Sequence, residues 1–143
     1  MYPEIMVIPM REELTRLGIE ELRNAADVDR FVEKESGPTM LIVNSICGCA
    51  AGRMRPAVRL ALQNATKPAK IATVFAGQDI EATARARAHF AGYPPSSPSI
   101  AILRDGKVVY MMHRHQIETR DAAAIAADLK SAFDQHCVAV AAQ

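Results

Sequence analysis

The balance of charges and the length of the chain limit what this protein can do. Its 143 residues include 17 Lys and Arg against 16 Asp and Glu, and the net charge of +1 gives no basis for binding nucleic acid. Half of the residues are hydrophobic, which is ordinary for a globular protein, but no apolar stretch approaches the ~18 residues of a membrane span. The length predicts a single domain over residues 1–143.

The N-terminal sequence and the cysteine count indicate a compartment. Residues 1–5 lack the basic start and apolar core of a signal peptide, so we expect a cytoplasmic protein. Structural disulfides are rare there, and a close pair of cysteines is more often catalytic or metal-binding. The chain has three cysteines, so one of them is unpaired at any time.

The chain before its first cysteine carries helix and strand signals. Pro9 is typical of a first helical turn and Gly18 of the position just past a helix end, while Asn24 is a good helix cap. The elements expected in this part are a helix over 9–18, a weak edge strand over 18–23, a helix over 24–36 and a buried apolar strand over 40–43.

The chain after its second cysteine continues to alternate helices and strands. Pro56 would crowd the carbonyl group of Gly52, so the helix there either kinks or begins near Pro56. Asp105 and Gly106 are a two-residue hairpin signal. The elements expected are a helix over 53–65, a strand over 70–76, a helix capped by Asp79 and ending near Ala91, strands over 99–103 and 107–112, and a helix from Thr119 or Asp121 to about His136. This order predicts a mixed β-sheet with helices on both faces.

Two thiols lie where the buried strand ends and a helical run begins. Cys47 and Cys49, separated by Gly48, lie between residues 40–43 and the helix-like segment from Arg53. Backbone N–H groups at a helix start are unpaired and partly positive, so they stabilise a thiolate and lower its pKa. Because Cys47 comes first and should be the more exposed thiol, we predict that it is the nucleophile.

The spacing of the two cysteines permits a disulfide. A disulfide needs Cα atoms roughly 4.4–6.8 Å apart, and residues two apart in an extended chain just reach the upper end of that range. Gly48 lets the chain bend and bring Cys47 and Cys49 within reach. We expect the small ring to be strained and readily reduced, which suits thiol exchange better than structural support.

The segment around the thiols resembles that of a known family. Residues 44–50, Asn-Ser-Ile-Cys-Gly-Cys-Ala, are similar to the active-site segment of the bacilliredoxins, which are small thioredoxin-like bacterial proteins. The match continues in order at residues 73–79, 92–99, 104–107 and 114–118. The resemblance implies a thioredoxin-like fold, a three-layer α/β/α sandwich with a central mixed sheet. It also implies a thiol–disulfide oxidoreductase that removes the small thiol bacillithiol from mixed disulfides on other proteins.

The same resemblance implies partners and further site residues. The expected partners are bacillithiol and S-bacillithiolated client proteins, with no metal and no cofactor besides the exchanging thiol, and with the protein as a monomer or weak dimer. Pro98 takes the place of the cis proline that faces the thiols in thioredoxin-like folds and leaves backbone groups free to hold a substrate. We therefore expect Ser97, Pro98 and Gly48 to contact the substrate.

Two residue roles stay open at this level. Cys49 either resolves the mixed disulfide on Cys47 or only tunes Cys47, which a second small thiol or a reductase then regenerates. Arg53, with Arg55 close by, lies one turn beyond Cys49, where its cation would favour the thiolate and attract the carboxylates of bacillithiol. A solvated arginine on the helix surface is the alternative.

Other functions are compatible with the pair of thiols. A general protein disulfide isomerase or reductase would also use it, although the chain lacks the Cys-x-x-Cys motif and the preceding Trp of thioredoxin. A non-catalytic metal-binding or thiol-sensing module is the second alternative. Cys137, beside His136, fits no common zinc spacing with the pair. We expect Cys137 to be a packed thiol, with a remote redox role left open.

Overall fold

Strand β2 (Pro38–Asn44) forms the centre of the structure, because both of its faces are covered. The computed structural model describes residues 1–34 and 37–137. All of β2 is buried. Met40 and Ile42 belong to one apolar cluster, and Leu41 and Val43 belong to the other, as the two-residue period of a strand requires.

The sheet has five strands in the order β1-β3-β2-β4-β5. The other strands are β1 (Glu20–Glu21), β3 (Lys70–Phe75), β4 (Ser99–Arg104) and β5 (Lys107–Met112). β1, β3 and β2 run parallel, whereas β4 pairs antiparallel with β2, and β5 with β4. Asn44 at the end of β2 is paired with Phe75 at the end of β3, so the segments that follow these two strands meet at one edge of the sheet.

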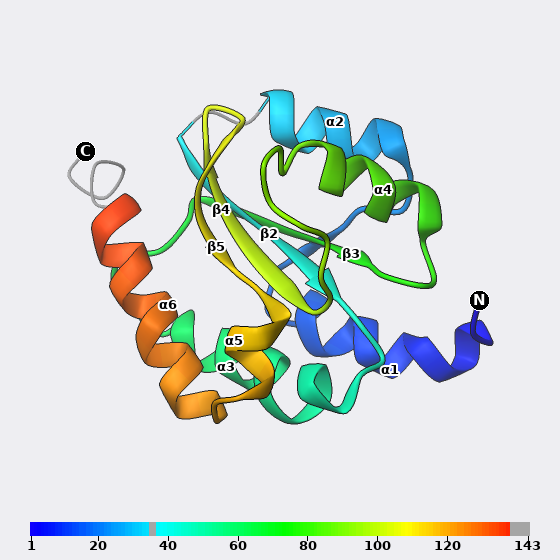
Figure 1. Cartoon of the computed structure of the whole chain (residues 1–143), viewed down its shortest axis with the longest axis horizontal. Coiled ribbons are helices and arrows are strands. Elements are labelled where there is room, and N and C mark those ends of the chain that lie inside the picture. The colour runs from blue at the N-terminus through cyan, green and yellow to red at the C-terminus, as the bar shows by residue number, and fades with distance from the viewer. Residues whose placement is uncertain (35–36, 138–143) are drawn as a thin grey trace.

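Helices cover both faces of the sheet (Figure 1). They are α1 (Glu4–Thr15), α2 (Ala25–Lys34), the π-helix η1 (Ala50–Met54), α3 (Arg55–Ala61), α4 (Ile80–Ala88), α5 (Arg114–Glu118) and α6 (Ala122–His136). α2 and α4 lie side by side on one face, and α3 and α6 lie together on the other (Figure 1). The predicted three-layer α/β/α sandwich is therefore confirmed. Among the described residues, no helix is long and apolar enough to cross a lipid bilayer.

Several local signals act as the sequence predicts. The Asn24 side chain accepts a hydrogen bond of 2.8 Å from an amide in the first turn of α2. α2 is described to Lys34, and its expected end at Ser36 lies outside the described residues. Asp105 and Gly106 have φ angles of 53° and 80°, and they close the hairpin between β4 and β5 as a two-residue turn with positive φ requires.

The predicted start of the first helix is wrong. α1 begins at Glu4, and Pro9 lies inside the helix instead of in its first turn. Val7, Arg11 and Leu14 are buried and recur at helical spacing, so one face of α1 packs against the rest of the protein. This packing outweighs the hydrogen bond that Pro9 cannot make.

The predicted cap of α4 has the right position but a different partner. Asp79 is the N-cap residue, yet its side chain makes no hydrogen bond to the helix. Its carboxylate accepts instead from Arg11 at 2.6 Å, and the Arg11 guanidinium also binds Glu4 and Glu21. Hydrogen bonding to Arg11 lowers the pKa of the Glu4 carboxyl. Because Arg11 is only 3% exposed, these carboxylates must neutralise its charge, and they tie α1 to the start of α4.

Candidate active site

The two thiols of the Cys-Gly-Cys segment lie just past the carboxyl end of β2. Cys47 and Cys49 are joined by a disulfide, with Cα atoms 5.3 Å apart, so the expected bridge is confirmed. Cys47 is half-buried and Gly48 is exposed, whereas Cys49 is 9% exposed and packs in an apolar cluster with residues of α3. The prediction that Cys47 is the more accessible thiol is also confirmed.

The chain turns into a helix directly after Cys47. The amides of Ala50 and Ala51 donate to the Cys47 carbonyl group at 2.9 and 3.2 Å. The Cys49 amide donates to Cys47 Sγ at 3.4 Å. The Cys47 sulfur therefore lies at a helix start within reach of an N–H donor, and in the reduced protein such a donor stabilises a thiolate.

The helix after the cysteines is widened just before Pro56. In η1 the Arg55 amide bonds to the carbonyl group of Ala50, five residues earlier. Pro56 then falls in the first turn of α3, where a missing N–H is tolerated. The sequence left open whether the helix kinks at Pro56 or begins there. In the structure the helical path begins at the cysteines and changes its hydrogen-bond pattern ahead of Pro56.

Hydrogen bonds hold the short segment between β2 and Cys47. The Cys47 amide donates to Ser45 Oγ at 2.9 Å, and the Ser45 amide donates to Asn44 Oδ1 at 2.9 Å. Asn44 Nδ2 donates to the carbonyl group of Met10 in α1 at 3.2 Å. Asn44 and Ser45 are buried, so their polar groups are paired inside the protein, as buried polar groups require.

Arg55 supports this segment as well. Its side chain is buried and donates to Asn44 Oδ1 at 3.0 Å and to the Ser45 carbonyl group at 2.9 Å. Its Nε donates to Glu13 at 3.0 Å, which neutralises the charge. The sequence placed Arg55 near the thiols as a cation, whereas in the structure its guanidinium binds the segment that leads to Cys47.

A cleft of about 430 Å³ opens beside Cys47. Its lining residues come from the N-terminus, the segment before the cysteines, the loop after β3, α4, the segment before β4, and α5. They are Tyr2, Ser45, Ile46, Cys47, Ala76, Gly77, Arg87, Ser97 and Arg114. The volume falls in the range of pockets that bind small organic ligands, and Cys47 contributes the only thiol of this lining.

The segment before β4 forms part of the cleft. The Ser97–Pro98 peptide bond is cis, as the resemblance implied. Ser97 lines the cleft, and Pro98 beside it is buried. Arg114 Nη1 donates to the Ser97 carbonyl group at 3.2 Å, and the Arg114 amide donates to Ser96 Oγ at 3.2 Å. The start of α5 therefore holds this segment in place, and substrate contact by Ser97 and Pro98 stays a prediction.

The arginines of the cleft differ from the one that the sequence singled out. Arg53 donates to the carbonyl group of Arg120, just before α6, and it does not line the cleft. Arg87 of α4 and Arg114 of α5 line it instead. Sequence reasoning missed both residues and the short helix α5. The His113–Gln116 spacing, which forms a capping box there, was a signal that could have found α5.

Tyr2 forms a wall of the cleft that the sequence also did not predict. Its amide donates to Gln78 Oε1 at 2.9 Å. Its ring packs so closely on Gly77 that a Cβ at that position would lie 3.2 Å from Tyr2 Cε2. Gly77 has a φ of 80°, a conformation that favours glycine. The N-terminus is thereby fixed beside Cys47.

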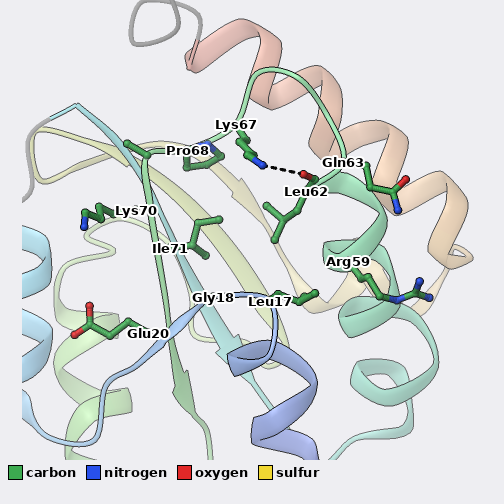
Figure 2. Close-up of a pocket in the computed structure, with 11 residues that line it drawn as sticks. Leu17, Gly18, Glu20, Arg59, Leu62, Gln63, Lys67, Pro68, Lys70 and Ile71 are labelled. Atoms are coloured by element: carbon green, nitrogen blue, oxygen red, sulfur yellow. Dashed lines mark hydrogen bonds between the residues drawn. The ribbon is translucent and has the colours of Figure 1, made fainter.

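A larger hollow, of about 610 Å³, lies at the opposite edge of the sheet (Figure 2). Lys70 and Ile71, which line it, begin β3, whereas the cysteines follow the end of the parallel strand β2. Lys67 donates to the Leu62 carbonyl group at 3.3 Å (Figure 2), and Arg59 is a further cation of this wall. No cysteine lines this hollow, so the thiol chemistry belongs to the smaller cleft.

Cys137, the third cysteine, lies apart from the pair in sequence and in environment. It follows the last residue of α6 and is fully buried in the apolar cluster that includes residues of α3 and α6. Burial raises the pKa of its thiol to about 11. The expected packed thiol is therefore confirmed, and its neutral form prevails near pH 7.

The fold matches solved structures of one class. A thioredoxin of Fasciola hepatica has a TM-score of 0.58 and 19% identity, over 82% of this chain and 99% of that one. The oxidised thioredoxin of Plasmodium falciparum has a TM-score of 0.57 and 13% identity, over 80% and 98% of the two chains. These likenesses show the thioredoxin fold. A thiol–disulfide oxidoreductase needs a cysteine pair that can form a disulfide and that a substrate can reach. This chain has such a pair at the end of the central strand of the fold.

Sequence relatives narrow that class to a family. The family model described as Disulphide isomerase matches residues 2–137. A bacilliredoxin of Koribacter versatilis (strain Ellin345) is 62% identical over 141 residues, which are 99% of this chain and 97% of the relative. Bacilliredoxins of Salinibacter ruber and Bacillus licheniformis are 54% and 47% identical, over 95% of this chain and 81% and 95% of their own. The chain belongs to this family, with the bacilliredoxins among its members, and it is a thiol–disulfide oxidoreductase.

Proposed function

We propose that this protein removes bacillithiol from mixed disulfides on client proteins, with Cys47 as the attacking thiol. The observation that carries the proposal is the difference between the two sulfurs. Cys47 borders the cleft and is half-buried, whereas Cys49 is packed in the core. The bacilliredoxin names of the relatives support bacillithiol as the small thiol.

The first step starts from the reduced pair. The Cys47 thiolate attacks the bacillithiol sulfur of the mixed disulfide, and a new S–S bond forms between them. The bond to the client breaks, and the client sulfur leaves with the electron pair and takes a proton from water. One disulfide replaces another without net oxidation, so the step needs no cofactor besides the exchanging thiol.

The second step is the resolution of the adduct by Cys49. Its thiolate attacks Cys47 Sγ, the bond described in the structure forms, and bacillithiol leaves as a thiolate. The cysteine pair is thereby oxidised, and an external thiol or a thiol reductase must reduce it. The Cα atoms of the two cysteines are 5.3 Å apart, so Cys49 can reach the adduct on Cys47, which supports this assignment. The alternative is that a second bacillithiol attacks the adduct directly while Cys49 only tunes Cys47 through its amide.

The remaining parts of the proposal concern how substrates reach Cys47. Gly48 is exposed beside the thiol, and Ser97 lines the cleft next to Pro98, so these residues are placed to contact an extended client segment. A role of Arg53 toward the thiolate or the substrate stays a prediction from the sequence, since its guanidinium donates to the Arg120 carbonyl group and does not line the cleft. We propose a cytoplasmic location, where thiols stay reduced, and we expect a monomer or weak dimer.

The proposal is tested with a client protein that carries bacillithiol on a single cysteine. Mass spectrometry follows the loss of the bacillithiol mass from the client after addition of the reduced protein. The wild type should remove bacillithiol, and Cys47→Ala should not. Removal by Cys47→Ala at the wild-type rate would contradict the proposal.

A second candidate function is protein disulfide isomerisation, which the family description favours. The recovery of activity by ribonuclease with scrambled disulfides measures it. Our proposal predicts that removal of bacillithiol is much faster than this recovery, and the reverse ranking would favour the isomerase.

A metal-binding or thiol-sensing module is the other alternative. Within the described residues, one group of side chains lies close enough to share a metal ion, namely Asp29, Glu33 and His89. This group contains no cysteine. A titration of the reduced protein with Zn²⁺ should show no tight binding that depends on Cys47. Binding below micromolar concentrations that Cys47→Ala abolishes would favour the module.

A further inference from the structure

The cleft beside Cys47 carries positive charge and no acidic side chain. Arg87 and Arg114 are its only charged lining residues, and apart from the Cys47 thiol the others are apolar, hydroxyl-bearing or glycine. The chain as a whole is nearly neutral, with a net charge of +1. Arg114 is ion-paired with Glu118, which lies outside the lining. Arg87 has no ion pair among the described residues, so its charge is the one that attracts anions beside the nucleophile.

Arg87 has a donor without a partner. Its Nε is buried and makes no hydrogen bond within the described part of the chain. A buried donor without an acceptor is costly, and most such groups in native proteins are paired. This N–H is closed to solvent in the structure, so a ligand oxygen would reach it only after a shift of the Arg87 side chain, which lines the cleft.

In the part of the chain that the structure describes, Arg114 is held in place by two of its guanidinium nitrogens, and the third is free to bind a ligand. Its Nε donates to Glu118 at 3.0 Å and its Nη1 to the Ser97 carbonyl group at 3.2 Å. Among the described residues, Nη2 has no hydrogen-bond partner. A guanidinium anchored on one side loses little freedom when it binds a carboxylate on the other.

We propose that Arg87 and Arg114 bind the carboxylates of the small thiol carried to Cys47, and that they make the cleft selective for anionic low-molecular-weight thiols. The inference rests on the proposed function and goes beyond it by assigning the groups that choose the thiol. Guanidinium groups match carboxylates in geometry as well as charge. The two arginines line the same cleft as Cys47, so a thiol with more than one carboxylate can contact both while its sulfur meets Cys47.

The test compares disulfides that differ in charge. Reduced Cys49→Ala protein retains Cys47, whose thiolate attacks a symmetric small disulfide, forms one new S–S bond and releases one thiolate. The probes are the disulfide of bacillithiol, which carries carboxylates, and bis(2-hydroxyethyl) disulfide, which is neutral. Acid quenching and mass spectrometry give the second-order rate of adduct formation for each probe.

In this background, Arg87→Gln with Arg114→Gln should slow the reaction of the anionic disulfide by about tenfold or more, because charge-assisted hydrogen bonds are lost. The reaction of the neutral disulfide should slow much less, by no more than the loss of the Arg114 hydrogen bond to the Ser97 carbonyl group causes. Arg59→Gln removes the same charge from the hollow of Figure 2 and should change neither rate. Equal slowing of both disulfides by the double variant, or slowing of the anionic one by Arg59→Gln to the same degree, would overturn the inference.

A second measurement needs no arginine variant. Malate, which has two carboxylates and no sulfur, should slow the anionic disulfide and leave the neutral one unchanged when ionic strength is held constant. No effect of malate on the anionic disulfide would count against the inference. Failure of both disulfides to react with Cys47 would instead refute the proposed function, so the two failures are distinguishable.

Discussion

Arg55 donates a hydrogen bond to the side-chain oxygen of Asn44 at 3.0 Å, and this contact joins the helix after the cysteines to the strand before them. The same oxygen accepts from the Ser45 amide, and Ser45 Oγ in turn accepts from the Cys47 amide. The position of Cys47 therefore depends on a buried guanidinium eight residues further along the chain.

Replacing Arg55 with Met should destabilise the protein by about 2–3 kcal/mol, because buried polar groups lose their partner while Glu13, at the surface, regains water. Urea unfolding measures the change. Arg16→Met is the matched control, since Arg16 is 76% exposed in its ion pair with Glu12, and it should cost less than about 0.5 kcal/mol. Equal losses in the two variants would contradict the role given to Arg55.

Two glycines near the site should respond oppositely to alanine. Gly77→Ala places a Cβ 3.2 Å from the Tyr2 ring at a φ of 80°, which should cost about 1–2 kcal/mol and displace Tyr2 from the cleft. Gly52→Ala meets no atom within 4 Å in a helical turn, so it should be neutral or stabilising by up to about 1 kcal/mol. Thermal unfolding compares them, and a stabilised Gly77→Ala would show that Tyr2 does not pack there.

Cys137 should make stability depend on alkaline pH. Its pKa is raised from 9.0 to about 11 by burial, so between these values the unfolded chain loses the thiol proton while the folded protein keeps it. The stability contributed by the neutral thiol is complete below pH 9 and is lost as pH rises toward 11. With the Cys47–Cys49 disulfide intact, wild type should lose roughly 1–2 kcal/mol more than Cys137→Val over this window.

Urea unfolding across that pH range checks the difference between the two proteins. Parallel curves would show that Cys137 titrates alike in the folded and unfolded states. Alkylation of the native, reduced protein near pH 8 gives an independent check, because Cys47 should react and Cys137 should not.

The sequence predicted the cysteine pair and the helices and strands that position it because those signals are local. The apolar run of β2, the helical spacing after Arg53, and the turn at Asp105 each lie within a few residues. Gly48 between the cysteines was enough to infer that the chain can bend and that a bridge can form. The error at Pro9 has a tertiary cause, since α1 extends back to Glu4 and Arg11 within it is buried through its contacts with Glu21 and Asp79.

The cleft could not be predicted in the same way, because its walls come from distant parts of the chain. Tyr2 meets the loop after β3 through Gln78, 76 residues later. From the sequence, Arg87 is an ordinary charged residue on a helix surface. Only the packing of α4 brings it into the cleft beside Cys47. Asp79 is likewise a residue type that caps helices, but its carboxylate accepts a hydrogen bond from Arg11, which is distant in the sequence.

The central claim is that Cys47 receives the small thiol, and the most direct measurement is to locate the adduct. Reduced Cys47→Ala and Cys49→Ala proteins are mixed with a bacillithiolated client, and peptide mass spectrometry identifies the modified residue. We predict a stable bacillithiol adduct on Cys47 in the Cys49→Ala protein and none in the Cys47→Ala protein. A stable adduct on Cys49 in Cys47→Ala, with Cys47 unmodified in the other variant, would contradict the account.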